Sequence, residues 1–111
     1  MKVATWNLDQ LRSNGARAAR QREAIRTINA DVWVFTETQR DFSPGPGYDC
    51  IACSTPAPDL PNAVARWVAI WSHLPATVVN LTADLERVAA IRLKDTRGAH
   101  QERKRPLRRV G

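Results

Sequence analysis

The chain has no long hydrophobic run and no recognisable export signal. No apolar segment approaches the ~20 residues that a membrane-spanning helix requires. The N-terminus does not combine a basic start, an apolar stretch and a small-residue cleavage site, so nothing predicts a secretory signal peptide. We therefore expect a soluble, cytoplasmic protein that does not span a membrane.

Cysteine and histidine are also scarce, which limits disulfide and zinc chemistry. Cys50 and Cys53 form the only C-x-x-C spacing, within a predicted strand at 48–54. Positions three apart in a strand point to opposite faces about 10 Å apart, beyond the roughly 7 Å between Cα atoms that a disulfide allows. The only histidines, His73 and His100, have no close ligand spacing for zinc. The sequence therefore predicts structural cysteines.

Basic residues are concentrated at the C-terminal end. Residues 1–92 hold ten Lys/Arg against nine Asp/Glu, whereas residues 93–111 hold seven against two. The overall composition, 43% hydrophobic and 25% charged in 111 residues, is typical of one small globular domain. After residue 93 the hydrophobic periodicity ends, so we expect a domain over 1–93 and a disordered basic tail over 94–111.

The first third of the chain predicts a β-α-β unit. The β-branched and aromatic run at 3–8 indicates a strand, and the segment 16–29 has helical spacing, with Ala18, Ile25 and Ile28 on one face and Ser13 or Asn14 available as the cap. Four consecutive apolar residues at 32–35 indicate a strand that is covered on both faces. Right-handed crossovers of this kind make the two strands parallel, so their carboxyl ends lie at the same edge of the sheet.

The rest of the chain predicts strands without helices. A proline- and glycine-rich loop at 43–47 separates the β-α-β unit from strand-like segments, which we expect to pair antiparallel. These segments lie at 48–54, 64–71, 77–81 and 87–93. The four tryptophans lie in apolar strands and are predicted to belong to the core rather than to stack on a substrate; they are Trp6, Trp33, Trp67 and Trp71.

Two polar side chains are brought together by the predicted parallel pairing. Asn7 ends the first strand and Glu37 directly follows the buried strand, so we expect the two to be neighbours. Magnesium in proteins is often held by one or two carboxylates, with water and substrate phosphate completing the octahedron. On residue types alone, however, a carboxylate at a strand end is more often solvated, and a terminal asparagine more often belongs to a turn.

A resemblance changes that balance. The run Ala4-Thr5-Trp6-Asn7-Leu8 is followed some thirty residues later by Ala30-Asp31-Val32-Trp33-Val34-Phe35-Thr36-Glu37-Thr38. Together the two runs resemble the opening of the endonuclease/exonuclease/phosphatase superfamily, with its DNase I-like fold. The segment 68–75 resembles a later strand and turn of that family, with His73 where arginine is common. The resemblance covers roughly the first ninety residues. It implies an α/β (α+β) fold, as the N-terminal part of a four-layer αββα sandwich.

The same resemblance implies a function. Members of the family hydrolyse phosphodiesters or phosphomonoesters with a divalent metal, usually Mg²⁺, with Mn²⁺ as the alternative. Asn7 matches the family's active-site asparagine beside the metal and phosphate, and Glu37 matches its metal-binding glutamate. We therefore expect both residues to serve as catalytic and metal-site residues. The implied substrate is a phosphate ester, with nucleic acid, lipid phosphate and nucleotide as the candidate classes.

Two motifs of the family do not occur in the sequence. These are a G-D-x-N turn, which orients the attacking water and the phosphate, and an S-D-H segment, whose histidine stabilises the phosphate. We therefore expect an incomplete sandwich that is inactive alone, with the missing C-terminal half supplied in trans if the protein is a split enzyme. The alternatives are a non-catalytic remnant and a fragment that binds nucleic acid through its basic tail, for which salt-sensitive phosphate contacts are expected.

Overall fold

A four-stranded mixed sheet is the centre of the structure. The computed structural model describes residues 1–9 and 15–94. The sheet has the order β1-β2-β4-β3, in which β1 pairs parallel with β2 and the other pairs are antiparallel. Its strands are β1 (Val3–Asn7), β2 (Val32–Gln39), β3 (Asp49–Cys53) and β4 (Ala65–Ser72). The described part of the chain is thus a small α+β domain.

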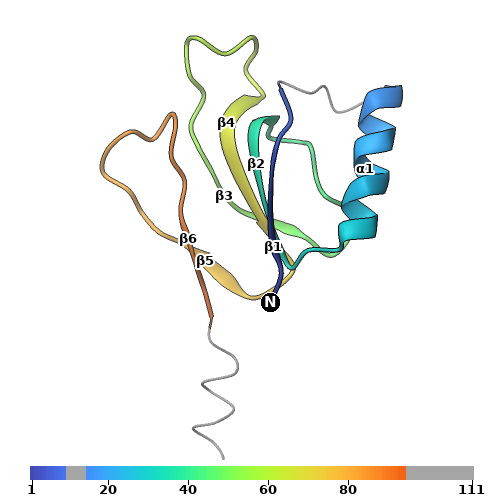
Figure 1. Ribbon diagram of the computed structural model, residues 1–111. Helices are drawn as coiled ribbons and strands as arrows, with labels where there is room; N and C mark the ends of the chain where they lie inside the picture. Colours follow the sequence, from blue (N-terminus) through green and yellow to red (C-terminus); the bar gives the residue numbers. More distant parts are fainter. Residues whose placement is uncertain (10–14, 95–111) are drawn as a thin grey trace, which may run out of the picture.

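Helix α1 (Ala16–Ile28) connects the two parallel strands (Figure 1). The pairing runs from Val3 opposite Val32 to Asn7 opposite Thr36, and the backbone N–H of Leu8 extends it by donating to the Thr36 carbonyl oxygen at 2.9 Å. The predicted β-α-β unit and its parallel pairing are confirmed.

The ends of α1 differ in part from the prediction. The N-cap residue is Gly15, with φ of 99° and no side-chain cap hydrogen bond, whereas Ser13 and Asn14 lie outside the described residues. Asn29 ends the helix in the left-handed conformation, and its N–H donates to the Ile25 carbonyl oxygen at 3.0 Å. Ile28 is 41% exposed, so the prediction that it shares the buried face was wrong.

The main core lies between α1 and the sheet. Ala18 and Ile25 of the helix contact a cluster that includes Trp33, Phe35 and Phe42. The Phe35 ring stacks on Trp33 with centroids 5.4 Å apart and meets the edge of Phe42 at 5.5 Å, which are favourable aromatic geometries. Full burial of an aromatic side chain contributes on the order of 3 kcal/mol, and this cluster is the largest of the three buried clusters in the described part of the chain.

A second, smaller sheet covers the opposite face. It pairs β5 (Ala76–Val78) with β6 (Ile91–Leu93), and Ile91 and Leu93 pack on Val68 and Ile70 of β4. Figure 1 shows α1 on one side of the main sheet and this pair on the other. Both strands are shorter than predicted: only residues 76–78 and 91–93 pair, and residues 87–90 run beside the main sheet without forming a strand.

The four tryptophans differ in burial. Trp33 and Trp71 are 1% and 9% exposed and belong to the core, as predicted. Trp6 packs half-buried against that core, and Trp67 packs half-buried against a separate small cluster that includes Leu60. The prediction of a core position therefore holds fully for only two of the four.

The predicted tail at 94–111 lies outside the described residues from 95 onward. Lys94, the last described residue, donates its backbone N–H to the Pro75 carbonyl oxygen at 2.9 Å. In residues 1–9 and 15–94 no helix is long and apolar enough to cross a bilayer.

Removing the central aromatic ring tests the core. We expect Phe35→Ala to lower the free energy of unfolding by about 3–5 kcal/mol, because it leaves a cavity between Trp33 and Phe42. The matched control is Val78→Thr, at a strand position that is 51% exposed, where a change within about 0.5 kcal/mol is expected. Urea unfolding followed by far-UV circular dichroism measures both. Equal effects of the two substitutions would contradict this description of the core.

Candidate functional site at the carboxyl edge of the parallel strands

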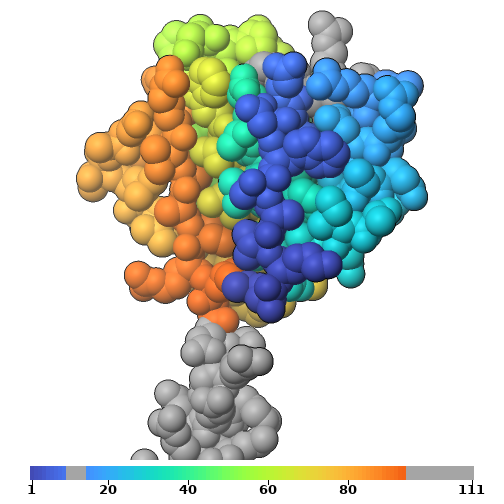
Figure 2. Space-filling view, viewed as in Figure 1, coloured from blue at the N-terminus to red at the C-terminus, as the bar shows by residue number. Residues whose placement is uncertain are grey.

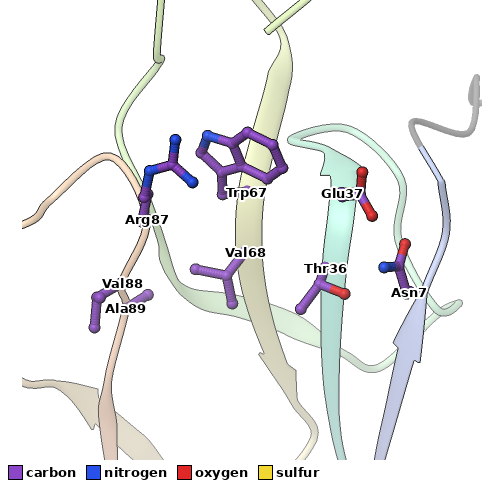
Figure 3. A pocket seen from close by; sticks show the side chains of 8 residues that line it. All are labelled: Asn7, Thr36, Glu37, Trp67, Val68, Arg87, Val88 and Ala89. Atoms are coloured by element: carbon purple, nitrogen blue, oxygen red, sulfur yellow. The ribbon is translucent and has the colours of Figure 1, made fainter. Parts of the chain in front are cut away.

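Asn7 and Glu37 line the same pocket, which has a volume of about 400 Å³ (Figure 3). The pocket lies on the side of the sheet away from α1, between the end of β1 and the segment that precedes β6. Figure 2 shows β2 and β4 on this surface between β1 and that segment. The lining residues are Asn7, Thr36, Glu37, Trp67, Val68, Arg87, Val88 and Ala89.

Asn7 ends β1 in a side-chain turn. Its Oδ1 atom accepts a hydrogen bond from the Asp9 backbone N–H at 2.9 Å, and Asp9 has the left-handed φ of 53°. One lone pair of the amide oxygen is thereby used. The side-chain NH₂ group makes no hydrogen bond to the described residues, and it is the part of Asn7 that can donate to an anion in the pocket.

Glu37 lies within β2, not after it as predicted. Its φ is 48°, the left-handed region that residues with a Cβ rarely adopt. Thr36 pairs with Val68 and Thr38 with Arg66, but Glu37, which stands opposite Trp67, is skipped by the pairing. Regular alternation would turn Glu37 to the helix side; because its backbone leaves the β conformation, its side chain instead lines the same pocket as Asn7.

The left-handed backbone at Glu37 carries an energetic cost. A non-glycine residue in a sparsely populated region costs about 1–3 kcal/mol and persists only where its surroundings enforce it. Here the paired residues on either side, Thr36 and Thr38, hold β2 against β4. Strain of this kind is concentrated at binding and catalytic sites, so it marks Glu37 as a functional candidate independently of its side chain.

The opposite wall of the pocket is formed by two residues that the sequence analysis did not assign to a site. The Arg87 guanidinium lies 4.9 Å from the centroid of the Trp67 ring and donates to Asp59 Oδ2 at 3.1 Å. In Figure 3 the guanidinium reaches over the pocket from the segment before β6. The sequence placed Arg87 in a strand and Trp67 in the core. No motif singles out an arginine in an irregular segment, so only the folded arrangement identifies it.

His73 lies at the other end of the sheet. Its Nε2 atom is 2.6 Å from Asp31 Oδ1, and Asp31 Oδ2 accepts the Lys2 backbone N–H at 2.7 Å. The Lys2 hydrogen bond, followed by the one to His73, lowers the pKa of the Asp31 carboxyl below its usual value. Since β2 pairs with β4 from Val32 to Gln39, this group lies about 13 Å or more along the strand from Glu37. His73 is therefore remote from the pocket, and His100 lies outside the described residues.

The two cysteines do not point to opposite faces, which corrects the sequence prediction. Cys50 pairs with Trp71 and Cys53 with Ala69, and a β-bulge between Cys50 and Ala52 inserts one extra residue into β3. The extra residue shifts the alternation by one position, so both cysteines lie on the α1 side of the sheet. Neither is in a disulfide.

No cluster of three or more His, Cys, Asp or Glu side chains is arranged to hold a metal ion among residues 1–9 and 15–94. Comparison with protein-family models, with curated proteins and with solved structures found no significant match to the chain.

The strain at Glu37 can be measured by exchanging two small residues. Glycine normally costs a strand about 0.5–1 kcal/mol relative to alanine. At the left-handed position alanine itself is strained by about 1–2 kcal/mol. We therefore expect Glu37→Gly to be more stable than Glu37→Ala by about 0.5 kcal/mol.

The control is the same pair at Thr5, an exposed position of the regular strand β1, where alanine should be the more stable. Urea denaturation of the four variants gives the comparison. If alanine were the more stable residue at Glu37 as well as at Thr5, Glu37 would have an ordinary strand conformation in solution.

Proposed function

We propose that the pocket at the carboxyl edge of β1 and β2 is part of the active site of a metal-dependent phosphoester hydrolase. In this proposal the chain is the N-terminal part of a domain of the endonuclease/exonuclease/phosphatase superfamily. The observation that carries it is the convergence of Asn7 and Glu37, thirty residues apart in sequence, on one pocket with a strained backbone at Glu37. These are the two residues for which the sequence resemblance implies a role at the metal and phosphate.

The layers of the structure support the architectural part of the proposal. Helix α1, the four-stranded sheet and the β5–β6 pair are stacked in that order, which corresponds to the first three layers of an αββα sandwich. A helix layer on the second sheet would complete it. Val78, Leu85 and Val88, on or near that second sheet, are each more than 40% exposed and are suitable for burial beneath such a layer.

The residues present supply only some of the ligands that a divalent cation needs. Glu37 provides one carboxylate, and Asn7 provides an amide oxygen that already accepts one hydrogen bond. Mg²⁺ is often bound through one or two carboxylates with several waters retained, so this donor set suits a weakly held Mg²⁺ or Mn²⁺ ion. When bound, the ion would polarise a phosphate oxygen and offset its developing negative charge.

The remaining polar groups would act on the phosphate. The Asn7 NH₂ group donates towards the pocket, and the Arg87 guanidinium supplies the positive charge that phosphate recognition requires. Neither residue is a base that can activate water at neutral pH. General acid-base help typically contributes about 10²- to 10⁴-fold and a charge-stabilising donor about 10²- to 10³-fold, so without those groups hydrolysis stays near background.

Nucleic-acid binding through the basic tail remains the alternative function. The tail lies outside the described residues, and no structural observation favours it.

Metal binding by three single variants tests the site. We expect the chain to bind Mn²⁺ weakly, Glu37→Gln to weaken binding about tenfold or more, and Asn7→Asp to strengthen it by a similar factor, because affinity for hard cations follows the number of carboxylates. Asn7→Asp keeps an oxygen for the Asp9 N–H. Glu23→Gln, on the exposed side of α1, is the control and should leave affinity unchanged. Electron paramagnetic resonance of free Mn²⁺ measures all four proteins.

Equal affinities of Glu37→Gln and Glu23→Gln would refute the metal site. In a parallel assay with bis(p-nitrophenyl) phosphate and plasmid DNA, the chain alone should show background hydrolysis. Metal-dependent hydrolysis that disappears in Glu37→Gln would instead show a self-sufficient active site. Hydrolysis unchanged by that substitution would indicate a contaminating nuclease.

A further inference from the structure

The bulge in β3 brings the two cysteines into an arrangement that the metal and phosphate site does not use. Cys50 and Cys53 are opposite Trp71 and Ala69, which are two positions apart on the regular strand β4. Residues two apart on a strand lie on one face with their Cα atoms about 7 Å apart. Because the bulge takes up one residue, the Cα atoms of Cys50 and Cys53 are about as far apart as those of residues two apart in a regular strand. That separation is close to the upper limit of about 6.8 Å for a disulfide.

The Cys50 thiol is directed along the strand towards Cys53. Cys50 Sγ is 3.7 Å from the Ala52 carbonyl oxygen, so the side chain leans in the direction of Cys53. Partial burial, followed by the negative charge that Cys53 carries as a thiolate, raises the pKa of Cys50 to about 11. Cys50 is therefore mostly a neutral thiol near pH 7, so its own attack on a disulfide is slow.

Both thiols are also open to a small reagent. Cys50 is exposed and Cys53 is partly exposed, at β3, the edge strand of the sheet. An edge strand has a neighbouring strand on one side only. A small movement of β3 that closes the disulfide therefore meets little resistance from packing.

We propose that Cys50 and Cys53 form a reversible dithiol–disulfide site that is oxidised by low-molecular-weight disulfides. One cysteine thiolate attacks a sulfur of the reagent, whose S–S bond breaks and releases one small thiol. The second cysteine then attacks the protein sulfur of the mixed disulfide, forms the Cys50–Cys53 bond and releases a second small thiol. The protein loses two electrons and two protons, and the reagent takes up both.

The geometry makes this bond easily reversible. A Cα separation at the upper limit leaves a strained bridge, and strained, exposed disulfides have the more oxidising potentials of labile or regulatory bonds. The bridge would also hold Cys53 in place next to Ser54. The Oγ atom of Ser54 accepts a hydrogen bond from the Val68 backbone N–H at 3.1 Å. Val68 also lines the pocket of Asn7 and Glu37.

Intact-mass measurement tests the proposal directly. The fully reduced chain is incubated with bis(2-hydroxyethyl) disulfide in buffer, blocked with N-ethylmaleimide and weighed. We expect a monomer that is lighter by two hydrogens and carries no maleimide, and that returns to two blockable thiols after dithiothreitol. Cys50→Ser, which keeps the size of the side chain and removes the thiol with the raised pKa, should instead accumulate the mixed disulfide on Cys53.

Three results would overturn the proposal. These are two reagent adducts on the native chain, a disulfide-linked dimer, and a bridge that forms in urea but not in buffer. The last result would show that native β3 holds the thiols apart. Tryptophan emission before and after oxidation confirms that the bridged chain remains folded.

Discussion

The parallel pairing of β1 with β2 is the constraint on which the rest of the structure depends. Two adjacent parallel strands require a crossover, and α1 provides it while burying one face of the sheet with Ala18 and Ile25. The same pairing places Asn7 opposite Thr36, the residue before Glu37. Stability and the candidate site therefore have one origin: the interaction that organises the core also brings two distant polar residues to one edge.

The opposite face carries the features that stability alone does not explain. A left-handed Glu37 costs free energy, and the Arg87 guanidinium over Trp67 forms a rim that is largely exposed to solvent. The apolar residues near this rim are only partly covered by β5 and β6. The helix side of the sheet is thus closed, whereas the second side is only partly covered, and it is on this second side that we propose the site.

The sequence predicts those features of the structure that leave a pattern over several consecutive residues. Periodicity over five or more residues correctly indicates β1, α1 and β2, and the crossover rule places Asn7 beside the end of β2. Local exceptions leave no such signal. One extra residue in β3 places Cys50 and Cys53 on the same face instead of on opposite faces, and nothing in the sequence around Glu37 indicates a positive φ. Arg87 enters the pocket from an irregular segment, where neither periodicity nor spacing applies.

Paramagnetic broadening by Mn²⁺ tests the central claim, that the carboxyl edge of β1 and β2 is a cation site. In ¹⁵N-labelled protein with substoichiometric Mn²⁺, the amide signals of Asn7, Thr36 and Glu37 should broaden first, and excess Mg²⁺ should restore them. The amides of Asp31 and His73, at the far end of the sheet, should stay sharp despite their exposed carboxylate. Broadening centred on Asp31, or spread evenly over the surface carboxylates, would contradict the account.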